Sequence, residues 1–369
     1  MELFVQGILS VTWQQLVMMA VGGILIYLGA AKEYEPALLI PMGLGTILVN
    51  IPFSGLVTQG ETVGVLDNLF HFGIATELFP LLIFIGIGAM IDFGPLLSNP
   101  SMLFFGAAAQ FGIFFTIILA VLLGFDIREA GSIGIIGAAD GPTSVFVSSK
   151  LAPHLLGPIT VAAYSYMALV PIIQPPAIRL VTTRSERRIK MKYHAESVSK
   201  TTKILFPIII TIVAGFIAPD SLPLVGFLMY GNLMREVGVL DRLSETAQNA
   251  LVNIITILLG LTISVTMQAA SFLTLQTLMI IGMGLIAFIM DSIGGVLFCK
   301  VLNLFRKEKI NPMIGAAGIS AFPMSARVIQ KMATAEDPKN FILNYSISAN
   351  VAGQIGSVIA GGLVLGLLK

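Results

Sequence analysis

The residues of this chain that could do chemistry are few, and the most informative ones lie inside apolar sequence. Asp140 stands in the segment GAADGPTSVFVSSK, and Ser320 and Arg327 stand in the segment NPMIGAAGISAFPMSARV. A carboxylate in a membrane segment costs on the order of 3 kcal/mol, so it is retained where it binds a cation, relays a proton or pairs with a base. We therefore predict a functional role for Asp140. The alternative is that Asp140 only caps a half-helix or pairs with Arg327.

Oxygen atoms suited to a hard cation such as Na⁺ accompany Asp140. Thr143 lies three residues later, Asn311 and Ser320 stand in the second segment, and Asn350 stands in SISANVAGQIGS. Carboxylate, hydroxyl, amide and carbonyl oxygens are the ligands that hard cations prefer. This set predicts a Na⁺ site. Small polar residues also hold membrane helices together, so a structural role stays open for each Ser and Asn taken singly.

A second tier of polar residues lies in other apolar stretches. Asp291, in IAFIMDSIGG, is another carboxylate, for which a structural or a conduction role is as reasonable as a binding one. Tyr164, Tyr166 and Tyr345 place phenols in apolar sequence, where a buried hydroxyl requires a hydrogen-bond partner.

The composition identifies the environment of these residues as a lipid bilayer. Of 369 residues, 56% are hydrophobic and only 11% are charged, against roughly 25% in soluble domains. The mean hydropathy is +0.92. The single cysteine, Cys299, cannot form an internal disulfide, and a net charge of +1 gives no indication of a nucleic-acid partner. The fold class predicted is an all-α polytopic membrane protein.

Apolar runs predict about ten transmembrane helices. They cover 12–31, 36–53, 76–91, 101–124, 155–178, 204–218, 222–239, 248–266, 275–299 and 341–368. Two further apolar stretches, 130–150 and 310–330, contain Gly, Pro and Ser and are predicted to be broken, re-entrant helical elements. Irregular backbone at membrane depth occurs where it is packed in protein or lines a cavity, so these breaks are where we expect the site.

The two broken elements resemble each other. Ile136-Gly137-Ala138-Ala139 recurs as Ile314-Gly315-Ala316-Ala317, 178 residues later. We interpret residues 1–178 as a first membrane repeat and 204–369 as a second. The polar segment 179–203 between them carries eight Lys and Arg residues, which predicts a cytoplasmic linker.

Five crossings per repeat would make the two repeats inverted and place the N-terminus outside the cell. Only Arg128, Lys150 and Lys369 of the 21 basic residues would then lie outside. The charge count alone does not decide whether the broken elements are re-entrant or cross the membrane fully. Inverted repeats are the usual plan of alternating-access transporters.

Three stretches together resemble a known family. They are GAADGPTSVFVSSKLAPHLLGPITVAAYSYMALVPIIQPP, NPMIGAAGISAFPMSARV and SISANVAGQIGS, and the similarity extends over essentially the whole chain. The chain is similar to the beta subunits of the sodium-pumping, biotin-dependent decarboxylases of oxaloacetate, methylmalonyl-CoA, glutaconyl-CoA or malonate. The resemblance implies that the chain decarboxylates carboxybiotin and exports Na⁺ across the bacterial cytoplasmic membrane.

Site residues follow from the resemblance position by position. Those implied are Asp140, Tyr166, Asn311, Gly315, Ser320, Arg327 and Asn350. We expect Na⁺ at Asp140, Asn311, Ser320 and Asn350, with Thr143 and Gly315 beside them. Arg327 is suited to gripping the carboxylate of carboxybiotin, and Na⁺ near Asp140 would favour release of a proton from Ser320 or Tyr166.

The resemblance also implies partners. These are a biotin-bearing carboxyltransferase alpha subunit or a biotin carrier protein, a small membrane gamma (delta) subunit, and two further copies of the chain in a homotrimer. The alternative function is a Na⁺-coupled secondary transporter of an organic anion, which inverted repeats and Asp140 fit equally well. Arg327 and the basic linker favour the pump, because a biotin carrier needs a positively charged cytoplasmic surface to dock on. The parent substrate and the number of Na⁺ ions per turnover do not follow from the sequence.

Overall fold

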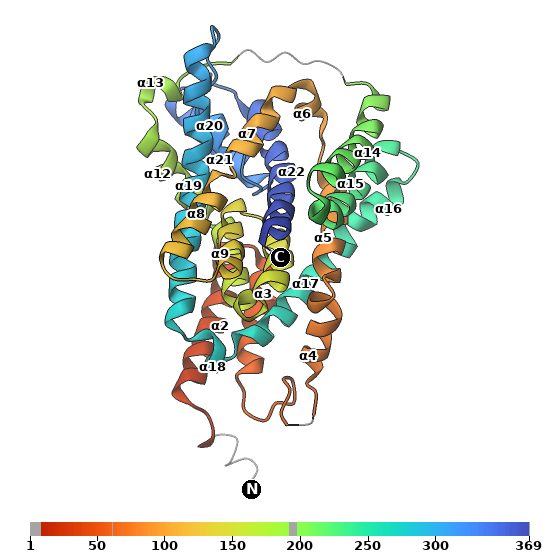
Figure 1. Cartoon of the computed structure of the whole chain (residues 1–369), viewed down its shortest axis with the longest axis vertical. Coiled ribbons are helices and arrows are strands. Elements are labelled where there is room, and N and C mark those ends of the chain that lie inside the picture. The colour runs from red at the N-terminus through yellow and green to blue at the C-terminus, as the bar shows by residue number, and fades with distance from the viewer. Residues whose placement is uncertain (1–8, 61, 192–197, 369) are drawn as a thin grey trace.

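Helices form almost all regular structure in the computed structural model, which describes residues 9–60, 62–191 and 198–368. Among the described residues, the N-terminal half contains eleven α-helices, and Figure 1 labels most of them. They are α2 (Trp13–Lys32), α3 (Pro36–Val49), α4 (Val65–Phe70), α5 (Leu78–Met90), α6 (Gly94–Ser98), α7 (Leu103–Ala108), α8 (Phe111–Leu122), α9 (Ile127–Gly134), α10 (Gly141–Leu151), α11 (Leu156–Ala168) and α12 (Val170–Val181).

The C-terminal half begins after a short helix, α13 (Arg184–Arg187), which lies in the expected linker. Its helices are α14 (Lys200–Ile217), α15 (Leu222–Val237), α16 (Asp241–Thr246), α17 (Val252–Ile263), α18 (Ala269–Phe272), α19 (Leu275–Phe305), α20 (Met313–Ala316), α21 (Met324–Glu336) and α22 (Leu343–Leu368). In both halves two apolar helices come first, a broken element follows later, and the half ends on a helix after the break.

Among the described residues, six helices are long and apolar enough to cross a membrane, and the number rises to eight if each of two bent pairs is one span. The prediction of ten crossings is therefore not confirmed. All ten predicted segments are helical, but α3 has 14 residues and α15 has 16. At 1.5 Å per residue, helices of this length fall short of a 30 Å hydrocarbon core.

The segment predicted as one helix over 155–178 is bent. Pro153–Ala168 and Val170–Val181 meet at an angle of 74°. Pro171 stands at the start of α12, where it has no N–H to continue the hydrogen-bond ladder of α11, and Pro175 and Pro176 follow inside α12. The bend directs α12 toward α21, against which it packs.

Both predicted breaks are present. In the first, a 3₁₀ turn over Ile135–Ala138 ends at Ala139, whose φ of 53° is left-handed, and α10 starts after Asp140. In the second, residues between Ala316 and Met324 leave helical geometry. The sequence reason is the same in each case, because Gly and Pro interrupt an otherwise apolar run.

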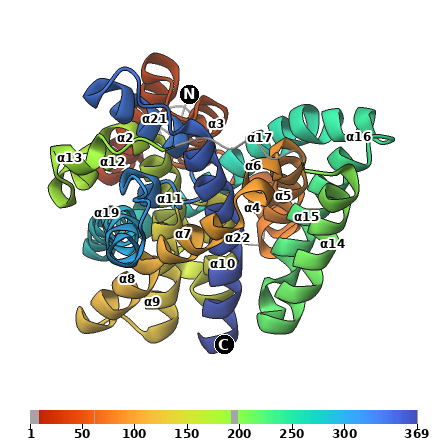
Figure 2. The ribbon, with the colours of Figure 1, turned by 90° about the horizontal axis from the view of Figure 1, so that it is seen from above.

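The long helix α22 lies between the two sides of the molecule, as the view from above shows (Figure 2). It packs against α7, α10 and α21, and also against α15. On the other side α5 crosses α15 closely. A Cβ atom on Gly88 would lie 1.8 Å from the Leu228 carbonyl oxygen, and one on Gly231 would lie 1.9 Å from the Ile85 oxygen. These glycines allow helices from the two halves to touch backbone to backbone.

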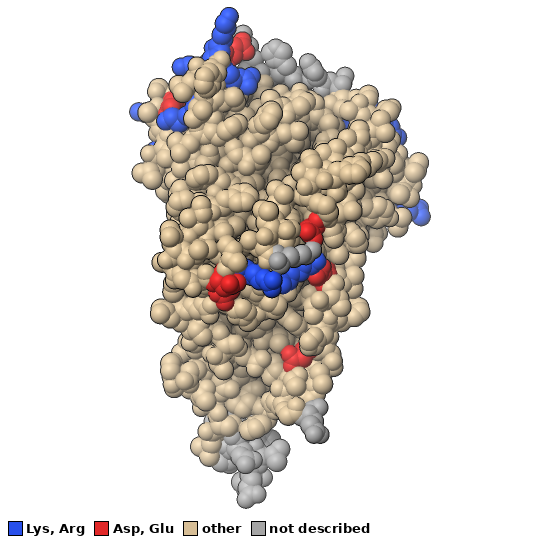
Figure 3. Space-filling model, in the orientation of Figure 1, with Lys and Arg blue, Asp and Glu red and all other residues tan. Residues whose placement is uncertain are grey.

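On the face shown in Figure 3, charged side chains form a cluster at one end of the molecule and a second group near its middle. On the face shown in Figure 3, Lys and Arg cluster at the end where α13 and the end of α19 lie. There the linker is held by ion pairs, including Arg187–Glu336 at 2.8 Å and Lys190–Asp337 at 2.9 Å. A separate group contains Lys150–Glu77 at 3.0 Å and His154–Glu129 at 2.8 Å.

Candidate functional site

Asp140 stands at the first break and caps the half-helix α10. Its Oδ1 accepts a hydrogen bond from the Thr143 amide at 3.2 Å, and its Oδ2 accepts one from the Thr143 hydroxyl at 2.8 Å. The short sequence Gly141-Pro142 starts α10 and leaves the carboxylate as its N-cap. Asp140 thus caps a half-helix, as the alternative interpretation stated, but the cap is only part of its environment.

The same carboxylate is also bound by the second half of the chain. Gln354 Nε2 donates to Asp140 Oδ2 at 3.1 Å, and Ser357 Oγ donates to it at 3.0 Å. Both side chains belong to α22, and Asp140 is only 3% exposed. Four donors in a buried site are the environment in which a carboxylate can stay charged or exchange its partners for a cation.

Ser320 joins the second break to this cluster. Its Oγ lies 2.5 Å from Ser357 Oγ and 2.9 Å from the Gly353 carbonyl oxygen. Its amide donates to the Ala138 carbonyl oxygen at 3.1 Å, so the two breaks are directly hydrogen-bonded to each other. The hydroxyls of Ser320 and Ser357 thus form a continuous chain that ends on Asp140.

A cavity of about 190 Å³ opens onto this cluster. The Tyr164 ring packs on the first break, because a Cβ on Gly141 would lie 2.1 Å from Tyr164 Cζ. The cavity brings together carboxylates, hydroxyls and a carboxamide, which are ligands for a hard cation. Its polar lining includes Glu35, Asp140, Tyr164, Thr256, Ser320 and Gln354.

Asn350 and Gly315 lie near the second break without contacting Asp140. Asn350 Nδ2 donates to the Ile319 carbonyl oxygen at 2.6 Å, and its buried Oδ1 has no hydrogen-bond partner among the described residues. Gly315 allows α20 to touch α19, since a Cβ on it would lie 2.0 Å from the Gly295 carbonyl oxygen. Asn350 thus binds the backbone of Ile319, the residue that precedes Ser320, whereas Gly315 acts through packing.

Asn311 and Tyr345 lie elsewhere. Asn311 Nδ2 donates to the carbonyl oxygens of Arg187 and Ile189 at 2.9 and 3.0 Å, so it anchors the linker. Tyr345 lines a different cavity, of about 520 Å³, together with the linker residue Lys190. The structure does not bring these two residues to Asp140.

Tyr166 and Arg327 are also separate from the carboxylate. The Tyr166 hydroxyl donates to the Ile281 carbonyl oxygen of α19 at 2.5 Å. Arg327 is exposed on α21, and within residues 9–60, 62–191 and 198–368 it forms no ion pair. The alternative in which Asp140 merely pairs with Arg327 is therefore wrong.

Asp291 is fully buried in α19 and lies behind the first break. A Cβ on Gly137 would lie 2.8 Å from Asp291 Oδ2, and one on Gly112 would lie 2.4 Å from Oδ1. Both carboxylate oxygens lack a well-formed hydrogen bond within the part of the chain that the structure describes. Its position supports the backbone of the break and does not face the cavity of Asp140.

Sequence reasoning missed Gln354 and Ser357 as members of the site. The signal was present, because Asn350, Gln354 and Ser357 are four and three residues apart and therefore share one face of α22. A related contact occurs at the other break, where Gln174 of α12 donates to the Ala316 carbonyl oxygen at 2.8 Å and to Ser325 Oγ at 2.8 Å. Each break is thus held by a glutamine from the opposite half.

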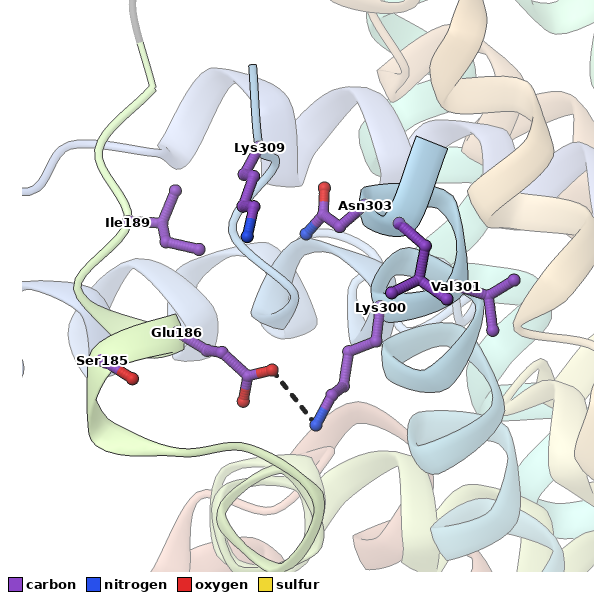
Figure 4. A pocket seen from close by; sticks show the side chains of 8 residues that line it. Ser185, Glu186, Ile189, Lys300, Val301, Asn303 and Lys309 are labelled. Carbon is purple, nitrogen blue, oxygen red and sulfur yellow. Dashed lines mark ion pairs between the residues drawn. The ribbon is translucent and has the colours of Figure 1, made fainter. Parts of the chain in front are cut away.

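The linker closes a further pocket next to α19, of about 560 Å³ (Figure 4). Glu186 and Lys300 point toward each other across it and form an ion pair at 3.1 Å. The ion pair joins the linker to α19 across this pocket, which is distinct from the cavity at Asp140.

Comparison with known proteins identifies relatives over almost the whole chain. Residues 14–368 match the family described as the Na⁺-transporting oxaloacetate decarboxylase beta subunit. The chain is 50% identical to the methylmalonyl-CoA decarboxylase subunit beta of Propionigenium modestum over 98% of this chain and 96% of that protein. It is 51% identical to the glutaconyl-CoA decarboxylase subunit beta of Acidaminococcus fermentans, with 98% and 95% covered. It is 43% identical to the oxaloacetate decarboxylase beta chain of Klebsiella pneumoniae, with 97% and 96% covered.

The chain belongs to the family of beta subunits of Na⁺-transporting decarboxylases. It is a multi-pass protein of the inner membrane and a subunit of a Na⁺-translocating decarboxylase. The alternative of a purely secondary transporter is not favoured.

Proposed function

We propose that this chain couples decarboxylation of carboxybiotin to Na⁺ export at the junction of the two breaks. The observation that carries the proposal is the chain of contacts from Ser320 through Ser357 to Asp140. It links a hydroxyl of one half to a carboxylate of the other within a buried cluster. A cation that changes the partners of Asp140 therefore changes the hydrogen bonding of Ser320.

The chemistry requires a proton. In carboxybiotin the bond between the ureido nitrogen and the carboxylate carbon breaks, its electron pair stays on nitrogen, and CO₂ leaves. The nitrogen then takes up one proton, so a proton donor promotes the reaction. Ser320 is the better placed of the two proposed donors, because it is connected to Asp140 while the Tyr166 hydroxyl is bonded to α19.

Coupling follows from competition for the carboxylate. Na⁺ at Asp140 takes the place of the Ser357 and Gln354 hydrogen bonds and favours proton loss from the serine pair. Asn350 Oδ1, which has no partner among the described residues, supplies a further oxygen near the second break. Moving each Na⁺ against 100 mV costs about 2.3 kcal/mol, so decarboxylation without bound Na⁺ must be slow.

The arrangement proposed for the whole chain is two inverted repeats, 1–178 and 204–369, joined by a cytoplasmic linker 179–203, with ten crossings and two re-entrant breaks. The recurring order of helices supports it, and so do the reciprocal contacts of Gln174 and Gln354. In such a plan a site shared by both breaks lies near the membrane midplane.

The partners proposed are a biotin-bearing alpha subunit or biotin carrier protein, a small gamma subunit and two further copies in a homotrimer. The basic linker supplies the positive surface for a carrier. α2 and α14 are the least buried of the spans, which leaves them available for lipid or a neighbouring subunit.

The test uses the full chain, purified with its partner subunits and placed in proteoliposomes with free carboxybiotin. We expect CO₂ release to require Na⁺ and to be accompanied by ²²Na⁺ movement. CO₂ release at the same rate without Na⁺ contradicts the coupling. Na⁺ movement driven by an organic anion without CO₂ release contradicts the decarboxylase role.

A further inference from the structure

A second carboxylate, Glu35, lines the cavity that contains Asp140. It lies in the turn between α2 and α3 and is half-buried, whereas Asp140 is 3% exposed. The two carboxylates thus occupy the more exposed and the more enclosed parts of one cavity. Tyr164 and Gln354 line the same cavity.

The backbone at Glu35 has an uncommon conformation. Its φ of 38° and ψ of 57° are left-handed, and the next residue is Pro36. A left-handed residue without a glycine is unfavourable, and a proline after it further restricts its backbone. Such conformations persist where the surroundings hold them.

No structural role accounts for the Glu35 carboxylate. Glu35 is the N-cap residue of α3, yet its side chain makes no capping hydrogen bond. Within the described residues it forms no ion pair or hydrogen bond with another side chain. A partly desolvated carboxylate without a partner is unfavourable, and either a proton or a bound cation relieves the cost.

We propose that Glu35 is the entry ligand of this cavity, which receives Na⁺ before it reaches Asp140. This inference rests on the proposed function, and in the proposed topology the turn at 33–35 faces the cytoplasm, from which exported Na⁺ comes. A carboxylate at the mouth of a low-dielectric cavity raises the local cation concentration and the rate of entry. Tyr164 and Thr256 line the same cavity and supply further hydroxyl oxygens.

The first test is Glu35→Gln in the complete complex in proteoliposomes. We expect the half-saturating Na⁺ concentration for decarboxylation to rise about tenfold, with the maximal rate kept within about twofold. Glu35→Asp should restore most of the Na⁺ affinity. The matched control is Glu33→Gln, because Glu33 is exposed in the same turn, is also left-handed and does not line the cavity.

Two outcomes overturn the proposal. One is an unchanged Na⁺ dependence in Glu35→Gln. The other is a lower maximal rate with an unchanged half-saturating concentration, which would indicate a merely structural role. Neither outcome affects the proposed function, which fails only if the wild-type complex shows no Na⁺-dependent decarboxylation.

A second measurement does not depend on turnover. Glu35→Cys should react with a membrane-impermeant thiol reagent added from the cytoplasmic side, and Na⁺ should slow the reaction while K⁺ does not. The wild-type chain serves as the background, because its one cysteine, Cys299, is buried. Reaction from the outer side only, or a rate unaffected by Na⁺, overturns the proposal.

Discussion

At the scale of residues, the site consists of one carboxylate whose partners come from both halves of the chain. Thr143 is local to the first break, whereas Gln354 and Ser357 come from α22. The hydrogen-bonded cluster around Asp140 contains one carboxylate among neutral donors, and one negative charge there suits a monovalent cation. The local cap orients the carboxylate, and the distant partners make it sensitive to the second break.

The first prediction concerns Ser357, which connects Asp140 to Ser320. Ser357→Ala should lower Na⁺-dependent turnover about ten- to a hundredfold, since a hydrogen bond to a charged group contributes roughly 1.5–3 kcal/mol. Ser357→Thr keeps the hydroxyl and should retain most of the activity. Turnover of Ser357→Ala at the wild-type rate would show that the serine chain is not part of coupling. Ser148→Ala, at another buried serine, is the control.

The sequence drew attention to Asp140 and Ser320 because polar residues in apolar runs stand out by their cost, and the structure brings the two residues together. The sequence was less informative about Tyr166 and Asn311, which are polar and buried for reasons that depend on distant neighbours. Tyr166 satisfies its hydroxyl on α19, 115 residues away in sequence. Such pairings depend on tertiary structure, which neither hydropathy nor spacing specifies.

At the scale of elements, the two helix breaks were predictable because Gly and Pro interrupt a hydrophobic pattern. The number of membrane crossings was not predictable in the same way. Hydropathy detects α3 and α15 as apolar but does not say whether helices of 14 and 16 residues span the bilayer. The 74° bend before α12 illustrates the same limit, since its direction depends on packing against α21.

The linker gives a pH prediction at this scale. Hydrogen bonds from Arg187, at 2.8 Å, and from Arg184 lower the pKa of Glu336 below its ordinary value of 4.5. A lowered pKa in the folded state means that the contribution to linker docking is complete above pH 4.5 and is lost as the pH falls through the lower folded value. Linker docking should therefore be constant between pH 6 and 8.

Trypsin cleavage at Arg187 and Arg188 measures this docking. Glu336→Gln should speed cleavage severalfold at pH 7.5, whereas Glu245→Gln, on an exposed helix end, should not. Cleavage of Glu336→Gln at the wild-type rate would reject the ion pairs as the anchor. So would a wild-type cleavage rate that, after correction for the pH dependence of trypsin itself, still changes between pH 6 and 8.

At the scale of the whole molecule, the two halves meet through α22 and through the close crossing of α5 and α15. The proposed inverted topology determines which residues are exposed on each face of the membrane.

Lys190→Cys should be labelled only from the cytoplasmic side, and Thr62→Cys only from outside. Labelling of both from one face would contradict the topology. As a control, each cysteine variant should retain Na⁺-dependent turnover.

The central claim, that Na⁺ at Asp140 licenses decarboxylation, is tested most directly by Asp140→Asn in the complete complex. CO₂ release from carboxybiotin and ²²Na⁺ movement are measured in the same proteoliposomes, with Asp126→Asn, an exposed helix cap, as the matched control. We predict that Asp140→Asn assembles normally but loses both Na⁺-dependent decarboxylation and Na⁺ movement, while the control keeps both. An Asp140→Asn complex that pumps at the wild-type rate with an unchanged Na⁺ dependence would contradict the account.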